Sequence, residues 1–213
     1  MNLTAAGQRP PMVLEDRTHF VNGRNLLPPF AAGLRQIRLG MGCYWGVERL
    51  FWSLPGIWVT AVGFAGGDLL HPTYKESCSG RTGHTEVVLL VYDPTILSLE
   101  SILKIFWENH DPTQLNRQGN DIGPQYRSAI FVDSAEDLQT VQTSQQSFQK
   151  QLDRAGFGKI TTEVALRHEF FYAHSDHQQY LARYPDGYCG LKGTGVVCPL
   201  PTVTVTIPTP VHS

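Results

Sequence analysis

Apolar runs typical of strands alternate with amphipathic runs typical of helices along this chain, and that order constrains its fold more than any other feature. Strands are predicted over residues 34–41, 57–64, 85–92, 127–132 and 161–166. Helices are predicted directly after Cys43, from a Ser98 cap to a point before Pro112, over residues 133–155 and, in short form, over 175–182. Because this order is less regular than successive βαβ units, we predict an α+β sandwich of helices over a mixed sheet.

The 213 residues suffice for one substantial domain with an extension, and the formal net charge of -2 says little about partners. No basic run is interleaved with aromatic residues and no apolar stretch is long enough to cross a bilayer, so neither nucleic acid nor a membrane is an expected partner. Pro10, Pro11, Glu15 and Asp16 stand where a secretory signal would need an apolar core, so we expect a cytoplasmic protein. In a reducing compartment, four cysteines are catalytic, redox-active, metal-binding or simply buried.

Cys43 lies in the segment Gly42-Cys43-Tyr44-Trp45-Gly46, between a predicted strand and a predicted helix. Unpaired backbone N–H groups and the helix dipole favour a thiolate at a helix N-terminus, so the pattern predicts a lowered thiol pKa and a reactive sulfur. Tyr44 and Trp45 are placed to wall an apolar pocket beside that sulfur. A small buried cysteine that only packs is the competing interpretation of this segment.

Two further cysteines, Cys189 and Cys198, lie in the glycine-rich segment 187–199. A flexible backbone lets a sulfur travel, as a resolving thiol must do to reach an oxidised partner elsewhere in the fold. A zinc site would need closely paired ligands such as C-x-x-C, and the sequence contains no such pair, so no metal is predicted.

Glu86 begins an otherwise apolar strand, where burial would raise its pKa and keep a proton available for general acid catalysis. A carboxylate at a solvated strand end is an equally good interpretation of this feature alone. Tyr74 and Tyr126 lie in polar, loop-like sequence, where their hydroxyls either donate hydrogen bonds to a bound oxygen or are simply exposed on packed rings.

A series of short blocks, in one order from about Arg38 to Pro199, is similar to peptide-methionine (S)-S-oxide reductases, the A-type methionine sulfoxide reductases. The blocks cover residues 42–48, 66–67, 72–74, 78–80, 82–84, 106–112, 119–121, 125–128 and 177–181. The resemblance implies a ferredoxin-like α+β sandwich with a long irregular C-terminal segment. It also implies reduction of the S epimer of methionine sulfoxide, free or in proteins, as part of protein repair and defence against oxidative stress.

The resemblance implies a catalytic role for five residues. Cys43 would attack the sulfoxide sulfur, and Glu86 would protonate the departing oxygen. Tyr74 and Tyr126 would help to bind that oxygen, and Asp121 would support the site.

The resemblance also implies how substrate is held and how the enzyme is regenerated. Tyr44 and Trp45 would hold the methyl group of the substrate. Cys189 would resolve the sulfenic acid on the catalytic cysteine as a disulfide, and Cys198 would take over the bond by exchange and present it to thioredoxin. No bound cofactor is implied, because the electrons come from thioredoxin or another dithiol, and a monomer is expected.

The implied organisation is an N-terminal extension over 1–33, a catalytic reductase domain over 34–200 with a mobile cysteine-containing loop over 185–200, and a tail over 201–213. Three residues depart from the family pattern: Tyr44 replaces phenylalanine, Lys192 replaces a small residue, and His71 replaces asparagine. None of them removes a reacting group. Cys78 matches a family cysteine with no step in the cycle, and we interpret it as structural.

Two other classes of protein compete with the reductase. A cysteine hydrolase or transferase would need a histidine base for Cys43, and His84, His110 and His177 are available. A hydrolase or transferase of this kind would not use Cys189 or Cys198. A redox-sensing or metal-binding module would explain the thiols but not Glu86 and its accompanying tyrosines.

Overall fold

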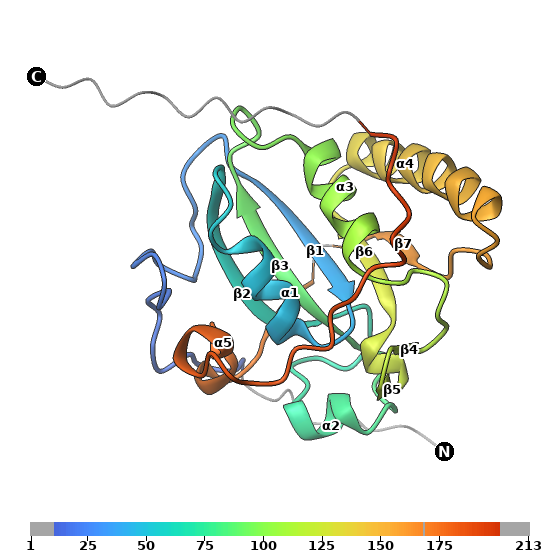
Figure 1. Ribbon diagram of the computed structural model, residues 1–213. Coiled ribbons are helices and arrows are strands. Elements are labelled where there is room, and N and C mark those ends of the chain that lie inside the picture. Colours follow the sequence, from blue (N-terminus) through green and yellow to red (C-terminus); the bar gives the residue numbers. More distant parts are fainter. Residues whose placement is uncertain (1–10, 168, 201–213) are drawn as a thin grey trace, which may run out of the picture.

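The computed structural model describes residues 11–167 and 169–200, which form a six-stranded sheet with helices packed on one face (Figure 1). The strands, in sheet order, are β7 (Glu163–Leu166), β6 (Ser128–Val132), β1 (Arg35–Met41), β3 (Thr85–Tyr92), β2 (Ile57–Ala65) and β8 (Phe171–Tyr172). The helices are α1 (Tyr44–Phe51), α2 (Tyr74–Cys78), α3 (Leu99–Asn109), α4 (Ala135–Arg154) and α5 (Tyr180–Arg183), with 3-10 turns at Pro124–Tyr126 and Ser175–His177. A small hairpin of β4 (Arg117–Gln118) and β5 (Asp121–Ile122) precedes β6.

The core of the sheet follows the chain order β1-α1-β2-β3-α3-β6, with the spatial order β6-β1-β3-β2. All neighbours within this group are antiparallel. This is the split βαβ arrangement. Strand β7 pairs in parallel with β6 after the crossover through α4, which makes the sheet mixed. The predicted α+β sandwich with a mixed sheet is confirmed.

Local sequence signals account for the main elements. Ser98 and Ser134 cap α3 and α4, because each hydroxyl oxygen accepts a hydrogen bond from a backbone N–H in the first turn. The apolar stripes of α1, α3 and α4 then bury large side chains in one core cluster with the sheet; these include Val47, Phe51, Phe106, Trp107, Val141 and Phe148. The strands predicted over 34–41, 57–64 and 85–92 are β1, β2 and β3.

Residues 11–33 pack on the opposite face of the sheet and along its edge. Leu14 and Leu26 are buried in a second apolar cluster with residues of β2 and β3, which are Val59, Ala61, Leu89 and Val91. At the edge of β2, Asn22 Nδ2 and Arg24 Nη1 donate hydrogen bonds to the carbonyl of Trp58. The segment therefore covers apolar surface that no helix protects.

Several short elements were not predicted from the sequence: α2, the β4–β5 hairpin and the edge strand β8. The single helix predicted over 175–182 is wrong. It is divided into the turn Ser175–His177 and α5, because Gln179 has the left-handed conformation (φ 47°, ψ 41°) and its N–H donates to the Glu48 carboxylate instead of to a helical carbonyl.

The predicted tail over 201–213 lies outside the described residues, as does the start of the N-terminal extension. Within the described ranges, no helix combines the length and the apolar character that crossing a bilayer requires.

Candidate active site

Antiparallel pairing brings Cys43 and Glu86 together at one end of the sheet. Strand β1 runs directly into Cys43, which precedes the first residue of α1. Leu39 of β1 pairs with Val88 of β3, so the end of β1 lies beside the start of β3, where Glu86 is located. The Glu86 carboxyl reaches the residue that follows Cys43, since the backbone N–H of Tyr44 donates a hydrogen bond of 3.1 Å to Glu86 Oε2, and it interacts electrostatically with the Cys43 thiol.

The same end of the sheet receives the other predicted catalytic residues. Met41 pairs with Ser128, which brings Tyr126 at the end of the preceding 3-10 turn to this end. Tyr74 begins α2, in the connection from the end of β2 to the start of β3, and Asp121 lies in the hairpin before β6. The ionisable groups of Tyr126 and Asp121 both interact electrostatically with the Cys43 thiol.

Cys43 caps α1 at its N-terminus, as predicted, but the prediction of a lowered thiol pKa is wrong. Burial raises the pKa of Cys43 well above its ordinary value, and the neighbouring Glu86 and Asp121 carboxyls raise it further. The backbone N–H of Trp45 at the helix start opposes this shift without cancelling it. The sulfur therefore carries a proton in the resting site.

Glu86 is buried, with 2% of its surface exposed. Burial raises the pKa of its carboxyl to about 8, against a smaller lowering by the Tyr44 N–H. At neutral pH the group is mostly a protonated acid, as the burial of its strand predicts. A neutral carboxylic acid next to a thiol supplies the proton that a departing oxygen needs.

Tyr74, Tyr126 and Cys78 surround the same centre. Burial raises the pKa values of both tyrosine hydroxyls, so they remain hydrogen-bond donors at any physiological pH. The side chain of Cys78, at the end of α2, hydrogen-bonds with the Tyr74 hydroxyl, so this cysteine contacts the site directly.

Tyr44 and Trp45, which were predicted to wall an apolar pocket, belong to an aromatic cluster that also includes His177 and Tyr180. The Tyr44 hydroxyl and His177 Nδ1 are hydrogen-bonded at 3.0 Å, and the Tyr74 ring also contacts His177, with the two ring centroids 4.6 Å apart. The Trp45 ring stacks on Tyr180 at 4.1 Å and on His177 at 5.8 Å. Both His177 and Tyr180 lie in the block 177–181 that carries the family resemblance, but the sequence alone gave neither of them a role in the substrate pocket.

Cys189 lies against α1, one turn beyond Cys43. A Cβ atom added at Gly46 would lie 2.8 Å from Cys189 Sγ, so only glycine leaves space for this sulfur. The thiols of Cys43 and Cys189 interact electrostatically. Beside them, the Tyr188 hydroxyl donates a 3.1 Å hydrogen bond to Asp121 Oδ2, which ties the C-terminal segment to the site.

Cys198 is 1% exposed and is held by helix α3. Its N–H donates to Glu108 Oε1 at 2.9 Å, and its carbonyl accepts from Lys104 Nζ at 2.8 Å. Lys104 and Glu108 also form an ion pair at 2.7 Å. Cys43, Cys78, Cys189 and Cys198 are all free thiols.

The hydrolase alternative finds no support in this geometry. Across residues 11–167 and 169–200, no histidine hydrogen-bonds to Cys43. His110 is buried between the Phe106 carbonyl and the Ser128 hydroxyl, and His177 bonds to Tyr44. In the same ranges, no cluster of three or more His, Cys, Asp or Glu side chains is arranged as a metal site.

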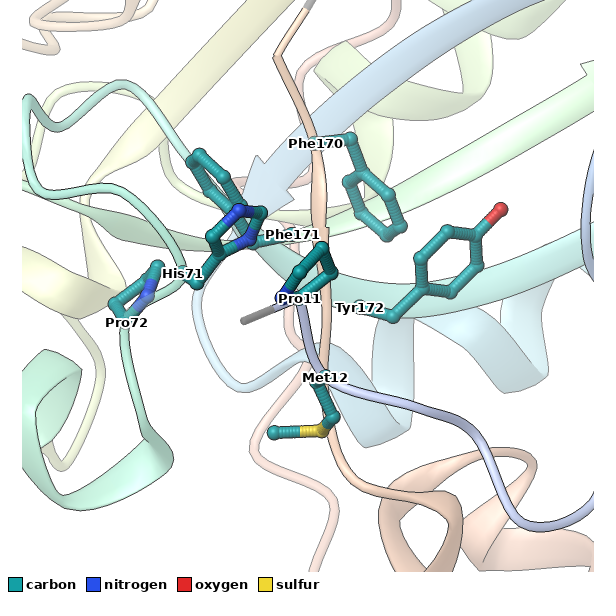
Figure 2. Close-up of a pocket in the computed structure, with 7 residues that line it drawn as sticks. All are labelled: Pro11, Met12, His71, Pro72, Phe170, Phe171 and Tyr172. Carbon is teal, nitrogen blue, oxygen red and sulfur yellow. The ribbon is translucent and has the colours of Figure 1, made fainter. Parts of the chain in front are cut away.

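A separate cavity of about 130 Å³ lies at the edge strand β8 and contains none of the predicted catalytic residues. Figure 2 shows His71 and Pro72 on one side of it and Phe170 and Tyr172 on the other, with Pro11 between them. The His71 ring packs edge-on against Phe171 at 5.3 Å. This contact anchors the loop that leads into α2 and Tyr74, which gives the unusual histidine at position 71 a structural role.

A buried acid beside a cysteine at a helix start, with a second thiol one helical turn away, defines a thiol-dependent oxidoreductase on an α+β scaffold. The comparisons with known proteins agree. The family model of peptide methionine sulfoxide reductase matches residues 35–197. The chain belongs to the peptide methionine sulfoxide reductase family.

Its relatives match over most of their lengths. MsrA of Pseudomonas aeruginosa is 59% identical over 181 residues, which cover 85% of this chain and 84% of that protein. MsrA of Methylococcus capsulatus is 56% identical over 182 residues, covering 85% and 82%. Among solved structures, methionine sulfoxide reductase A of Corynebacterium diphtheriae superposes with a TM-score of 0.79 and 44% identity, covering 91% of this chain and 94% of that one.

Proposed function

We propose that this protein reduces the S epimer of methionine sulfoxide, free or in proteins, through a sulfenic acid on Cys43. Cys43 attacks the sulfoxide sulfur, Glu86 gives its proton to the oxygen, and the oxygen passes to the cysteine. The substrate is reduced to a thioether, and the thiol is oxidised to Cys43–SOH. The proton lost by the Cys43 thiol returns Glu86 to its acid form, so atoms and charge balance.

The protonated Glu86 beside the Cys43 thiol is the observation that carries this proposal. A pKa of about 8 makes Glu86 an acid at neutral pH, and the Tyr74 and Tyr126 hydroxyls remain donors for the sulfoxide oxygen. The raised pKa keeps the Cys43 thiol protonated in the resting site, so this thiol supplies the proton that returns Glu86 to its acid form after Glu86 has protonated the oxygen. Asp121 supports the site through its electrostatic contact with Cys43, and the Tyr44–Trp45 rings receive the methyl group.

Regeneration is proposed to run through the two C-terminal thiols. The Cys189 thiol attacks the sulfenic sulfur and releases water, which leaves a Cys43–Cys189 disulfide; its position against Gly46 supports this step. Cys198 then attacks Cys189 and frees Cys43. Because Cys198 is held by Lys104 and Glu108, this exchange requires the end of the cysteine loop to leave helix α3.

Thioredoxin is proposed as the dithiol that reduces the final disulfide, and no bound cofactor is required. Mxr1 of Saccharomyces cerevisiae, whose reduced form is 31% identical to this chain with a TM-score of 0.69, has also been solved in complex with Trx2. We further propose that the protein works as a monomer in the cytoplasm, in protein repair and defence against oxidative stress.

The test is turnover of racemic methionine sulfoxide with a dithiol reductant, with the two sulfur epimers resolved. The proposal predicts loss of the S epimer only, and no loss with Cys43→Ser. Cys189→Ser should abolish thioredoxin-driven turnover while still removing one oxygen per enzyme, and Gln146→Ser, at an exposed position of α4, is the control that keeps the relay. Consumption of neither epimer by folded wild-type protein would contradict the proposal.

A further inference from the structure

A buried carboxylate that the reaction does not use connects the catalytic helix to the aromatic wall of the site. Glu48 lies on α1, one turn after Trp45, and is 0% exposed. Its Oε2 accepts a hydrogen bond from the Gln179 backbone N–H at 2.8 Å. Its Oε1 accepts from Gln179 Nε2 at 2.7 Å and from the Thr60 hydroxyl at 2.9 Å. A buried acid with this many donors is held in one position.

The N-terminal segment supplies the outer part of this network. The Thr60 hydroxyl donates to Glu48, so its oxygen accepts from His19 Nε2, which lies 2.9 Å away. His19 Nδ1 in turn accepts the backbone N–H groups of Val21 and Asn22. A histidine that donates from Nε2 and accepts at Nδ1 must have a neutral imidazole. Burial lowers the pKa of His19 to about 4, which keeps the ring neutral at pH 7.

The same segment also contacts the polypeptide around Gln179 directly. The Phe20 N–H donates to Gln179 Oε1 at 3.1 Å. The N–H groups of Glu15 and Asp16 donate to the Ser175 hydroxyl at 3.0 and 3.4 Å. Residues 11–33 therefore support the stretch 175–183 from outside, while Glu48 holds it from inside.

The conformation that these contacts impose determines where two site residues lie. Gln179 adopts a left-handed backbone, which costs a residue with a side chain free energy and persists only when neighbouring contacts fix it. Gln179 lies between the turn that ends at His177 and α5, which begins at Tyr180, and both of these rings stack on Trp45. His177 and Tyr180 are three positions apart, with Gln178 and Gln179 between them, so a change in the backbone of Gln179 would move one ring relative to the other against Trp45.

We infer that Glu48 is a positioning residue of the methionine sulfoxide pocket: it holds Gln179 so that His177 and Tyr180 stay against Trp45, with residues 11–33 as the outer support. This inference rests on the proposed function. Glu48 contacts neither substrate nor the reacting sulfur, so its loss should weaken substrate binding and leave the chemical step nearly unchanged.

The test is single-turnover reduction of methionine sulfoxide by the full-length reduced protein, with rate measured against substrate concentration. Three donors point at the Glu48 carboxyl, and Glu48→Gln places an amide NH2 group against at least one of them. We therefore expect the substrate concentration for half-maximal rate to rise by about tenfold while the saturated rate stays within about twofold. The double variant Glu48→Gln with Gln179→Glu restores a donor–acceptor pair and should recover most of the lost affinity. If Glu48→Gln does not fold, Thr60→Val removes one donor to Glu48 without changing side-chain shape and should raise the same concentration by about threefold.

Ser144→Ala is the matched control, because it removes a buried hydrogen bond from Trp107 Nε1 between α3 and α4 and touches no site residue. It should lower the unfolding temperature without changing the substrate concentration dependence. Unchanged concentration dependence in Glu48→Gln, or a loss that the double variant does not recover, would overturn the inference. Failure of the wild type itself to reduce the sulfoxide would instead contradict the proposed function.

Discussion

The substitution Glu86→Gln tests the central electrostatic feature of the site, because it removes the titration and keeps the shape of the neutral acid. The folded pKa is raised from 4.5 to about 8, so ionising Glu86 inside the protein costs on the order of 5 kcal/mol more than ionising it in water. The unfolded chain ionises above pH 4.5 and the folded protein does not. A raised acid pKa therefore lowers stability as pH rises from the unfolded value towards the folded one.

The glutamine variant does not carry this penalty. The free energy of unfolding of the variant, relative to that of the wild type, should rise by about 3 kcal/mol between pH 5 and pH 8. Urea unfolding at both pH values measures the difference. The exposed Glu136→Gln, in the first turn of α4, is the matched control and should show no such trend.

The same variant separates stability from catalysis. Without a proton to give, single-turnover reduction should slow by about 10²–10⁴-fold. The wild-type rate should be highest below pH 8 and fall as Glu86 ionises through its pKa of about 8, whereas the variant's small rate should not follow that titration. A variant that loses stability relative to wild type at pH 8, or that keeps the wild-type pH profile, would refute the assignment of Glu86 as a buried neutral acid.

Two further predictions concern the thiols and the aromatic pocket. Gly46→Ala places a methyl group 2.8 Å from Cys189 Sγ, so formation of the Cys43–Cys189 disulfide should slow by about tenfold or more, while methionine release stays near the wild-type rate. Rapid quenching followed by thiol counting resolves the two steps. Equal slowing of both steps would contradict the reasoning. Tyr44→Phe removes the hydroxyl bonded to His177, so we expect about 0.5–1.5 kcal/mol weaker substrate binding, seen as a several-fold higher half-maximal concentration with an unchanged maximal rate. A tighter-binding phenylalanine variant would show that the hydrogen bond is not a support of the pocket.

Periodicity and capping predicted most of the fold correctly because they are local properties. The strand over 85–92 and the Ser98 cap follow from a few neighbouring residues, and the structure confirms both. Short elements were missed where long-range contacts decide the conformation. Strand β8 forms because it pairs with Gly63 and Phe64 of β2. It is only two residues long, which is too short for its sequence pattern to predict a strand.

The candidate site, like the fold, has features that the sequence predicts and features that depend on long-range contacts. From the sequence, the reacting groups are a prediction: the resemblance to the family implies the roles of Cys43, Glu86 and Cys189. The sequence could not give the ionisation state of the thiol: the helix start suggested a lowered pKa, and burial with two nearby carboxyls reversed the sign.

The sequence by itself determined the chemistry that the chain can carry, because residue types and their local spacing fix which nucleophile, acid and second thiol are available. Only the tertiary structure decided how these groups behave. Antiparallel pairing set Cys43 beside Glu86, and the packing of the C-terminal part of the chain against α1 brought His177 to Tyr44. Desolvation and contact depend on atoms that are far apart in the chain and close in space, so no local pattern contains them.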